Sequence, residues 1–473
     1  LASKPASRFL SMTTNTTGSA KATSIETNDV LPIPAGERHG KAWHLFTVWT
    51  TPNLEFATVF VGALAIGFGL NVWQGLLAVL VGNALAGITH GLLSTWGPAA
   101  GLPQMVLGRN AFGKWGNLIP SGMSTLVAGI GWFAVNTVSG TFALQALFPA
   151  LGLIGSLAVI IVVQVGVAFV GHNLIQKWER YLSYFQAIVW IIVIFVVLGQ
   201  QGAFDVAPAA DAAFPWAGFT LTAGAAYGYT AGWTAFASDY TRYLPANTSK
   251  KSLGLAAGLG NFTATTLIMG VGVIAFNALA GNPGDFWGIA NPTSTFTSEF
   301  NPVFAAVVLF SIVIGSVSAN ILNVYSGAMS FLAMGFKFGF KTRRAIMVLL
   351  AGIAGGLLSY AGVQNGDVAH QLDSFLLVVS YWVSPWIAVV LTERILSKGK
   401  NAGERALAPK NSWAGAAAFV IATVFSIWGF ANQVLYTGVF AKDTGIGDLT
   451  AVVGFVAASV LFVVFSKLDK NSK

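Results

Sequence analysis

The chain has 473 residues, of which 55% are hydrophobic and 9% are charged. Soluble domains carry about a quarter charged residues, so this composition excludes an ordinary soluble protein and indicates a chain that spans a membrane. The net charge of +8 comes from basic residues scattered between apolar segments. Because these residues form no patch, they indicate membrane orientation and no nucleic-acid partner.

The chain starts with a polar tail, and long apolar stretches follow from residue 43 onward. The tail, residues 1–42, is predicted to be disordered because its first part is rich in Ser, Thr and Asn. A helix needs about 20 apolar residues to cross a hydrocarbon core of roughly 30 Å. On that criterion we predict twelve spans, at residues 43–69, 72–96, 118–147, 152–172, 178–200, 216–237, 252–279, 301–334, 343–363, 372–396, 412–436 and 447–466.

The charges between the predicted spans alternate from one side of the membrane to the other. One side carries every Lys and Arg except Lys442, whereas the opposite side carries Lys442 together with acids such as Asp205, Asp373 and Asp448. Basic loops stay in the cytoplasm under the positive-inside rule. We therefore expect an even number of spans, two cytoplasmic termini and a place in the plasma (inner) membrane.

Glu55 lies in the middle of the first predicted span, next to Pro52 and Asn53. An ionisable group inside a membrane span is costly and is by default functional. Proline cannot continue a regular helix, so we predict that the first span is broken where Glu55 lies. Broken helices in the membrane are typical of binding sites in transporters.

A second broken helix is predicted in the span at 216–237, which contains Gly224, Gly228 and Gly232. Each glycine disfavours a continuous helix by about 1 kcal/mol relative to alanine. This span lies five spans after the first, so an inverted repeat of two five-helix halves would place the two breaks opposite each other at mid-membrane. The alternative is that these glycines only permit close helix packing.

The third span carries Trp132 and Asn136, which are four residues apart and so share a helix face. An indole ring with an amide one turn away suits a flat heteroaromatic solute, which stacks on the ring and bonds to the amide. The alternative is that Trp132 is ordinary lipid-facing or core bulk.

The eighth span carries Ser316, Ser318, Asn320, Asn323 and Tyr325. Polar groups inside the hydrocarbon need partners, which a water-filled or solute-filled cavity supplies. Serine can instead bond to its own helix. The two asparagines are harder to explain in that way, so we expect this span to line a binding site.

Motifs along the hydrophobic region resemble those of one family. The loop from Gly108 through Arg109 to Gly113 resembles that family's cytoplasmic Arg-x-x-Phe-Gly signature, and Pro120 matches its proline-containing start of helix three. Further similarities are Gly131-Trp132 with Asn136, Gly232-Trp233 followed by Ser238-Asp239-Tyr240-Thr241-Arg242, the asparagine-rich eighth span, and Ser384-Pro385. The chain thus resembles the nucleobase–cation symporter-1 family, whose members carry cytosine, purines, uracil, allantoin, hydantoins or related compounds with a cation.

The resemblance implies an all-α membrane fold of the leucine-transporter type that works by alternating access. Ten helices would form two inverted repeats, with helices one and six broken, and two further helices would be peripheral. The implied divisions are residues 1–42 as the tail, 43–200 as the first repeat, 201–397 as the second repeat and 398–473 as the peripheral helices.

The resemblance also implies roles for individual residues. Trp132 and Trp233 would sandwich the substrate ring, while Asn136 and Asn323 would bond to its edge. Gly232 and Asn53 complete the expected site. Members with Asn where this chain has Asn136 resemble the purine–cytosine branch, so we expect cytosine or a purine as substrate.

Glu55 departs from the family pattern, in which a neutral polar residue is common near this position. An ionised carboxylate there can accept two N–H groups from the edge of cytosine, adenine or guanine. Glu55 therefore has two candidate roles, in substrate binding and in carrying a proton.

The residues expected to couple transport to a cation are Glu55, Ser318 and Asn320. Sodium-driven members resemble one another in using first-helix carbonyls and two adjacent Ser or Thr hydroxyls on helix eight. Ser318 supplies one hydroxyl, but its neighbours Val317 and Ala319 supply none, and a hard cation needs several oxygen ligands. We therefore favour a proton over sodium as the co-transported cation.

Other classes of protein are less favoured. The chain has no Cys, no His pair at ligand spacing and no phosphate-binding loop, so we expect no enzyme activity, cofactor or metal. The first alternative is a sodium-coupled carrier of allantoin, a hydantoin, uracil or a thiamine precursor. The second is a polar-lined channel, which would not need paired helix breaks. We expect a monomer whose partners are a nucleobase-like solute and the lipid bilayer.

Overall fold

The computed structural model describes residues 30–170, 172–206, 214–279, 286–336, 338 and 340–471. Over these residues the chain is almost entirely helical, with one isolated β-bridge between Asn432 and Thr437. Most of the predicted disordered tail, residues 1–29, lies outside the described residues.

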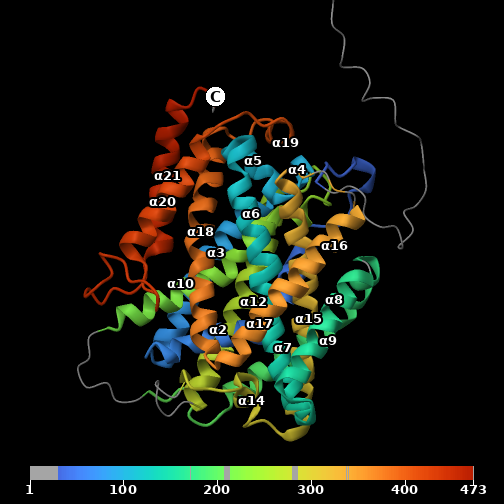
Figure 1. Ribbon diagram of the computed structural model, residues 1–473, viewed down its shortest axis with the longest axis vertical. Helices are drawn as coiled ribbons and strands as arrows, with labels where there is room; N and C mark the ends of the chain where they lie inside the picture. The colour runs from blue at the N-terminus through green and yellow to red at the C-terminus, as the bar shows by residue number, and fades with distance from the viewer. Residues whose placement is uncertain are drawn as a thin grey trace, which may run out of the picture.

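The helices follow one another along the chain and build a single bundle (Figure 1). They are α1 (His44–Thr50), α2 (Phe56–Gly67), α3 (Val72–Ser94), α4 (Gly97–Ala100), α5 (Gln104–Gly116), α6 (Leu118–Leu126), α7 (Phe133–Leu147), α8 (Gly152–Val170), α9 (His172–Leu198), α10 (Trp216–Gly232), α11 (Ala237–Thr241), α12 (Lys250–Leu279), α14 (Pro292–Thr297), α15 (Pro302–Ala333), α16 (Phe340–Leu350), α17 (Gly356–Asn365), α18 (Val368–Leu396), α19 (Ala402–Leu407), α20 (Ala414–Phe430) and α21 (Thr450–Leu468).

Eight helical segments in the described part of the chain are long and apolar enough to cross a membrane. They are Val72–Ala100, Leu118–Leu147, Pro149–Val167, Lys250–Leu279, Pro302–Ala333, Ala345–Asn365, Val368–Leu396 and Thr450–Leu468. Large apolar side chains are exposed on the outer helices, such as Val162 on α8 and Phe195 on α9, each 70% exposed. Such a surface suits lipid as its surroundings. The prediction of an all-α membrane protein is therefore confirmed.

The number of twelve spans stays a prediction. The eight segments coincide with eight of the twelve predicted spans, and the remaining four contain shorter or interrupted helical segments. These four are the spans predicted at residues 43–69, 178–200, 216–237 and 412–436.

Helices that are far apart in the sequence form the centre of the bundle. α2 packs against α12, α10 packs against α3, and α7 packs against α15. α18 contacts both α10 and α21, while α20 pairs with α21 at one edge of the bundle (Figure 1). α4, α5, α19 and the C-terminus lie at one end of the bundle, and α14 lies at the opposite end (Figure 1).

Two glycines explain how closely α2 and α12 approach. A Cβ atom on Gly62 would lie 1.8 Å from the carbonyl oxygen of Met269, and one on Gly272 would lie 1.8 Å from that of Val59. Only glycine fits at either position, because the backbone of the facing helix occupies the space of a side chain. Such small-residue contacts are typical of helix pairs in membranes.

The signature-like segment on α5 has a structural role at the end of the bundle where the C-terminus lies. Arg109 donates from Nη2 to the carbonyl of Ala333 at 2.7 Å, which satisfies a carbonyl at the last turn of α15. α5 is kinked at Gly113, whose φ of +67° favours glycine. The kink lets the N–H of Lys114 donate to the carbonyl of Lys410 at 3.1 Å.

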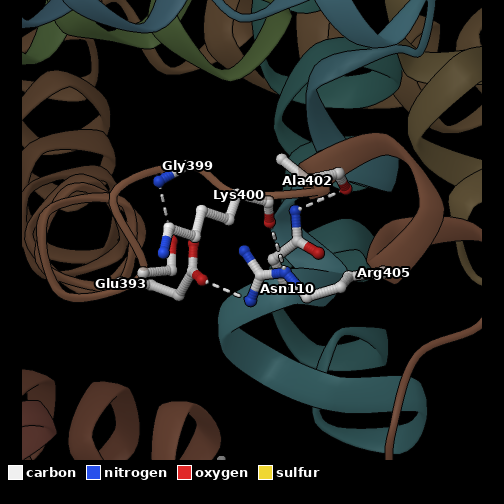
Figure 2. A network of polar contacts seen from close by, with 7 residues as sticks. Asn110, Glu393, Gly399, Lys400, Ala402 and Arg405 are labelled. Atoms are coloured by element: carbon white, nitrogen blue, oxygen red, sulfur yellow. Dashed lines mark hydrogen bonds and ion pairs between the residues drawn. The ribbon is translucent and has the colours of Figure 1, made fainter.

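A polar network at the same end joins α5, α18 and α19 (Figure 2). Arg405 of α19 donates from Nη1 to Oε1 of Glu393 at 2.7 Å and from Nε to the carbonyl of Lys400 at 3.1 Å (Figure 2). Asn110 of α5 donates to the carbonyl of Ala402 at 3.0 Å. These bonds fold the segment after α18 back onto α5.

Candidate functional site

The first predicted span is helical on both sides of a short irregular stretch. α1 ends at Thr50, a 3-10 turn covers Thr51–Asn53, and α2 begins at Phe56. Between them, Leu54 (φ −84°, ψ 65°) and Glu55 (φ −153°, ψ 168°) have non-helical backbone angles. Backbone groups at a helix end lack partners within the helix, so the stretch exposes polar groups inside the bundle. We refer to Thr51–Glu55 as the first-helix break.

Glu55 is 1% exposed and has one oxygen bonded and one without a partner. The hydroxyl of Tyr229 on α10 donates to Oε1 of Glu55 at 3.1 Å and lies 2.6 Å from Oγ1 of Thr58. Oε2 of Glu55 is buried and has no hydrogen-bond partner among the described residues. A buried carboxylate oxygen without a partner is costly, so this atom is a candidate acceptor for a solute N–H group or a proton.

Trp132 forms an aromatic cluster next to Glu55. It ends a π-helical turn at Val127–Trp132 between α6 and α7. Its ring meets Tyr229 edge-on at 5.1 Å between centroids and Phe375 of α18 edge-on at 5.0 Å. A Cβ atom on Gly232 would lie 3.4 Å from Cζ2 of Trp132, so the glycine backbone adjoins the indole. Trp132, Gly232 and Glu55 therefore meet around Tyr229.

Trp233 is held at the first-helix break by Asn53. Its Nε1 donates to Oδ1 of Asn53 at 3.0 Å. Asn53 in turn donates from Nδ2 to the carbonyl of Trp49 at 2.7 Å and to Oδ1 of Asn261 at 3.2 Å. Trp233 packs in the same side-chain cluster as Trp49, whereas Trp132 belongs to a different cluster. In this conformation each of the two indoles has its own aromatic neighbours.

The three predicted asparagines of the third and eighth spans lie together. Asn136 donates from Nδ2 to Oδ1 of Asn320 at 3.0 Å, and Asn323 donates to the same oxygen at 3.4 Å. Asn320 donates to the carbonyl of Phe133 at 3.0 Å. Oδ1 of Asn323 is buried and without a partner among the described residues. Asn320 therefore accepts hydrogen bonds from both neighbouring asparagines, and Asn323 keeps an acceptor without a partner among the described residues.

Ser318 lies on the face of α15 that turns toward the first-helix break. Ser318 is half-buried and follows Gly315 by three residues, and such residues share a helix face. A Cβ atom on Gly315 would lie 3.2 Å from Cβ of Glu55. Ser316, one of the other serines, bonds back to the carbonyl of Val313 on its own helix at 2.9 Å. That is the alternative expected for serines in this span.

The glycines of the sixth span lie in regular helix. α10 is helical through Gly224, Gly228 and Gly232, and a 3-10 turn begins at Trp233. A Cβ atom on Gly228 would lie 2.2 Å from the carbonyl oxygen of Leu376. Gly228 thus permits close packing of α10 on α18, and the irregular backbone lies at the end of α10.

Several buried polar residues around the break were not singled out by sequence reasoning. Gln186 of α9 bonds to the break, Asn261 of α12 bonds to Asn53, and Tyr229 bonds to Glu55. Gln186 and Asn261 each stand in an apolar helix, the same signal that identified Glu55. Tyr229 is a largely apolar aromatic residue in a span with several aromatics, so it gave a weaker signal in the sequence.

A helical membrane bundle with buried polar side chains gathered at an interrupted helix has the construction of a solute carrier. Residues 32–454 match the family described as "Permease for cytosine/purines, uracil, thiamine, allantoin". The chain therefore belongs to this permease family, and the resemblance seen in its motifs is confirmed.

Curated relatives and solved structures agree with this membership. The chain is 28% identical to the putative purine-cytosine permease YxlA of Bacillus subtilis over 94% of this chain and 96% of the relative. It is 24% identical to the purine-cytosine permease fcyB of Emericella nidulans over 93% and 88% of the two chains. The relatives are permeases and not enzymes.

The fold is that of a solved transporter. The structure superimposes with a TM-score of 0.69 on Mhp1, a nucleobase-cation-symport-1 family transporter in a closed conformation with bromovinylhydantoin bound, at 19% identity over 94% of this chain and 97% of that chain. Against the inward-facing conformation of Mhp1 the TM-score is 0.65, at 18% identity over 95% and 96% of the two chains.

Proposed function

We propose that the protein is a secondary transporter that imports a nucleobase, cytosine or a purine, together with a cation by alternating access. The observation that carries this proposal is the pair of buried acceptors without partners, Oε2 of Glu55 and Oδ1 of Asn323, in a bundle that also holds Trp132. Acceptors that point at the N–H edge of a flat ring give specificity, because a solute lacking that edge leaves them unpaired. The names of the relatives YxlA and fcyB support a purine or cytosine.

The proposed architecture has twelve spans, of which ten form two inverted five-helix repeats. The helix contacts support this division. Exchanging the repeats would turn the pair α1–α12 into the pair α10–α3, and both pairs are in contact, while α3–α12 and α7–α15 would map onto themselves. The repeats comprise residues 43–200 and 201–397. The tail is residues 1–42, and the two peripheral helices, α20 and α21, lie within residues 398–473.

In the proposed site, Trp132 stacks on the substrate ring, and Gly232 leaves room for the ring beside it. Glu55 accepts an N–H group, while Asn136 and Asn323 bond to another edge. Trp233 forms the opposite wall, and Asn53 fixes its indole by the bond at 3.0 Å. These roles are supported by the contacts of Trp132 and Glu55 with one residue, Tyr229.

We propose a proton as the coupling cation, with Glu55 as the group that carries it. Three observations favour a proton over sodium. Glu55 has a free oxygen at the break, Ser318 is flanked by the apolar Val317 and Ala319, and the first-helix carbonyl of Leu54 accepts a hydrogen bond from Gln186 at 3.3 Å. Asn320 would contribute to coupling by holding the asparagine group on α15.

The bundle end that holds the C-terminus is proposed to face the cytoplasm. Basic residues lie on the elements of this end: Arg109 on α5, Arg394 in the last turn of α18 and Arg405 on α19. The positive-inside rule places such an end in the cytoplasm, with both termini. We propose that the protein works in this orientation as a monomer in the plasma (inner) membrane.

A thermal-shift panel tests the proposed substrate. The purified protein is melted with cytosine, adenine, guanine, hypoxanthine, uracil, allantoin and hydantoins, because a ligand that binds only the folded state raises its melting temperature. We expect cytosine or a purine to give the largest shift. A shift with allantoin, a hydantoin or uracil alone would instead favour the alternative of a sodium-coupled carrier for a related heterocycle.

An uptake assay in proteoliposomes separates a carrier from a channel. Uptake of the best ligand from the panel is measured against its concentration and against unlabelled competitor. We expect uptake that saturates and is competed. Uptake that rises linearly without limit would support a polar-lined channel.

A further inference from the structure

Gln186 of α9 joins three elements at the first-helix break. Its side chain is 3% exposed. Nε2 donates to the carbonyl of Leu54 at 3.3 Å and to the carbonyl of Ser311 on α15 at 3.1 Å. Oε1 accepts a hydrogen bond from the hydroxyl of the same Ser311. One amide thus uses its donors and its acceptor to bridge α9, α15 and the break.

The carbonyl of Leu54 needs such a donor. The non-helical angles of Leu54 and Glu55 remove this carbonyl from the regular helix pattern. A buried carbonyl without a donor is costly, and no water is present in the hydrocarbon to supply one. Among the described residues, the side chain that donates to this carbonyl is Gln186.

The packing around the bridge leaves little freedom. A Cβ atom on Gly315 would lie 2.7 Å from Nε2 of Gln186, 3.2 Å from Cβ of Glu55 and 3.5 Å from the carbonyl oxygen of Leu54. At Gly315, the backbone of α15 therefore packs against both Gln186 and Glu55. Because Leu54 directly precedes Glu55, fixing the carbonyl of Leu54 also fixes the backbone from which the Glu55 side chain starts.

We propose that Gln186 is a positioning residue that holds the first-helix break closed against α9 and α15 and thereby orients Glu55. The part of this inference that concerns Glu55 rests on the proposed function, whereas the part that concerns the break does not. A movement of α9 away from α15 would break both donor bonds of Gln186 together. The amide thus links the position of α9 to the geometry of the site.

A plainer role for Gln186 is to hold two helices together, as many buried amides in membranes do. Asn277 of α12 offers a matched control for that role. Its Nδ2 donates to the carbonyls of Gly202, Ala203 and Asp205 at 3.3, 3.2 and 3.1 Å, so it also bridges a helix to backbone carbonyls. It does so at the segment after α9, and within the described part of the chain its side chain forms no hydrogen bond to the break.

The first experiment measures how open the break is, without any ligand. The chain contains no Cys, so Thr51→Cys introduces a single thiol at the half-buried start of the break. The rate of maleimide labelling is measured for Thr51→Cys alone and then with Gln186→Leu, Ser311→Ala or Asn277→Leu added to it. We expect labelling to rise about tenfold with Gln186→Leu, in line with the loss of its one hydrogen bond to the break, and less with Ser311→Ala.

The control decides how the rate is interpreted. Asn277→Leu is expected to lower the melting temperature while the labelling rate stays unchanged. The proposal is overturned if Thr51→Cys is labelled at the same rate with and without Gln186→Leu. It is also overturned if Asn277→Leu raises the labelling rate as much as Gln186→Leu does. Should Gln186→Leu fail to fold, Ser311→Ala gives the same decision, because it removes only the hydroxyl bond to Oε1.

The second experiment asks whether Gln186 acts through Glu55. The affinity for cytosine and for adenine is measured in Gln186→Leu, Glu55→Gln and the double variant. We expect Gln186→Leu to weaken binding about tenfold alone and to have little further effect beside Glu55→Gln, because residues that act as a unit are not additive. Fully additive losses would overturn the positioning role.

The two proposals fail in different ways. If the unaltered protein binds none of the nucleobases but Gln186→Leu still opens the break, the proposed function fails and the bridge at the break stands. If the protein binds a nucleobase and Gln186→Leu changes neither labelling nor affinity, the inference on Gln186 fails and the proposed function stands.

Discussion

The hydroxyl of Tyr229 donates to Oε1 of Glu55 at 3.1 Å. The ring of the same tyrosine meets Trp132 edge-on at 5.1 Å between centroids. One residue of α10 therefore connects the acid of the first-helix break to the aromatic residue of the third predicted span. Its hydroxyl bonds to Oε1 of Glu55, and Oε2 is the carboxylate oxygen without a partner among the described residues.

Tyr229→Phe separates these two contacts. The variant keeps the ring beside Trp132 and removes the hydrogen bond to Glu55. We expect the affinity for cytosine and adenine to fall about fivefold, the equivalent of about 1 kcal/mol for one hydrogen bond. The measurement is isothermal titration or a thermal-shift titration. A full loss of affinity for every ligand, together with a large fall in melting temperature, would show that the hydroxyl serves the fold instead.

Glu55→Gln tests the two candidate roles of the acid. The amide has the same shape but cannot carry a proton as an acid does, and it offers a donor where the substrate N–H group needs an acceptor. We expect the affinity for amino-bearing nucleobases to fall by about 1.5–3 kcal/mol, the range for a hydrogen bond to a charged group. We also expect the pH dependence of uptake to flatten. If both affinity and pH response are retained, Glu55 has a structural role.

Trp132→Ala and Trp233→Ala test the proposed walls of the site. Loss of a stacking face costs about 1–3 kcal/mol per base, so each variant is expected to bind cytosine at least fivefold more weakly. Trp115→Ala is the matched control, because Trp115 is 63% exposed at the end of α5. An unchanged affinity in both site variants would remove the two indoles from the substrate site.

Replacing sodium by choline tests the coupling cation. If a proton drives transport, uptake into proteoliposomes under an imposed pH gradient stays nearly unchanged after the replacement, and a protonophore abolishes it. Collapse of uptake in choline would refute the proton and point to oxygen ligands for sodium at the break and on α15. The same assay with Glu55→Gln shows whether the proton response depends on this acid.

Asp469 is expected to stabilise the last part of the fold in a pH-dependent way. Desolvation raises its pKa, but hydrogen bonds from Ser412 and from the backbone N–H groups of Asn471, Trp413 and Ala414 outweigh this effect and hold the pKa below its usual value. Because the pKa is lower in the folded than in the unfolded protein, the stabilisation is fully present at a pH above the unfolded-state pKa, which is near 3.9 in model peptides. It is lost as the pH falls through the folded-state pKa.

The corresponding variant is Asp469→Ala, which removes the side-chain acceptor at the start of α20. We expect a loss of about 1 kcal/mol of stability at neutral pH, as for other residues that cap a helix start. The difference in melting temperature from the unaltered protein should shrink as the pH is lowered below about 4. A difference that stays constant across this range would show that the charge of Asp469 contributes nothing.

Local patterns were sufficient to identify the candidate residues but not how they are grouped. Glu55, Pro52 and Asn53 were singled out because an acid, a proline and an amide interrupt an apolar run, and the backbone is non-helical at Leu54 and Glu55. The glycines of the sixth span were open to two interpretations. Gly228 faces the backbone of Leu376. This contact depends on how α10 packs against α18 and is not visible in the sequence of either helix alone.

By itself, the sequence determined the class of this protein. The composition and the length of the apolar runs require a helical membrane bundle, since in lipid a helix satisfies its own backbone groups. Motifs around Arg109 and Trp132 identified the permease family, because they lie close together in the chain. Tertiary structure alone decided the partners: the bonds of Tyr229 to Glu55 and of Gln186 to Leu54 join residues 174 and 132 positions apart. Such contacts depend on how helices pack in three dimensions, and no local pattern of residues specifies them.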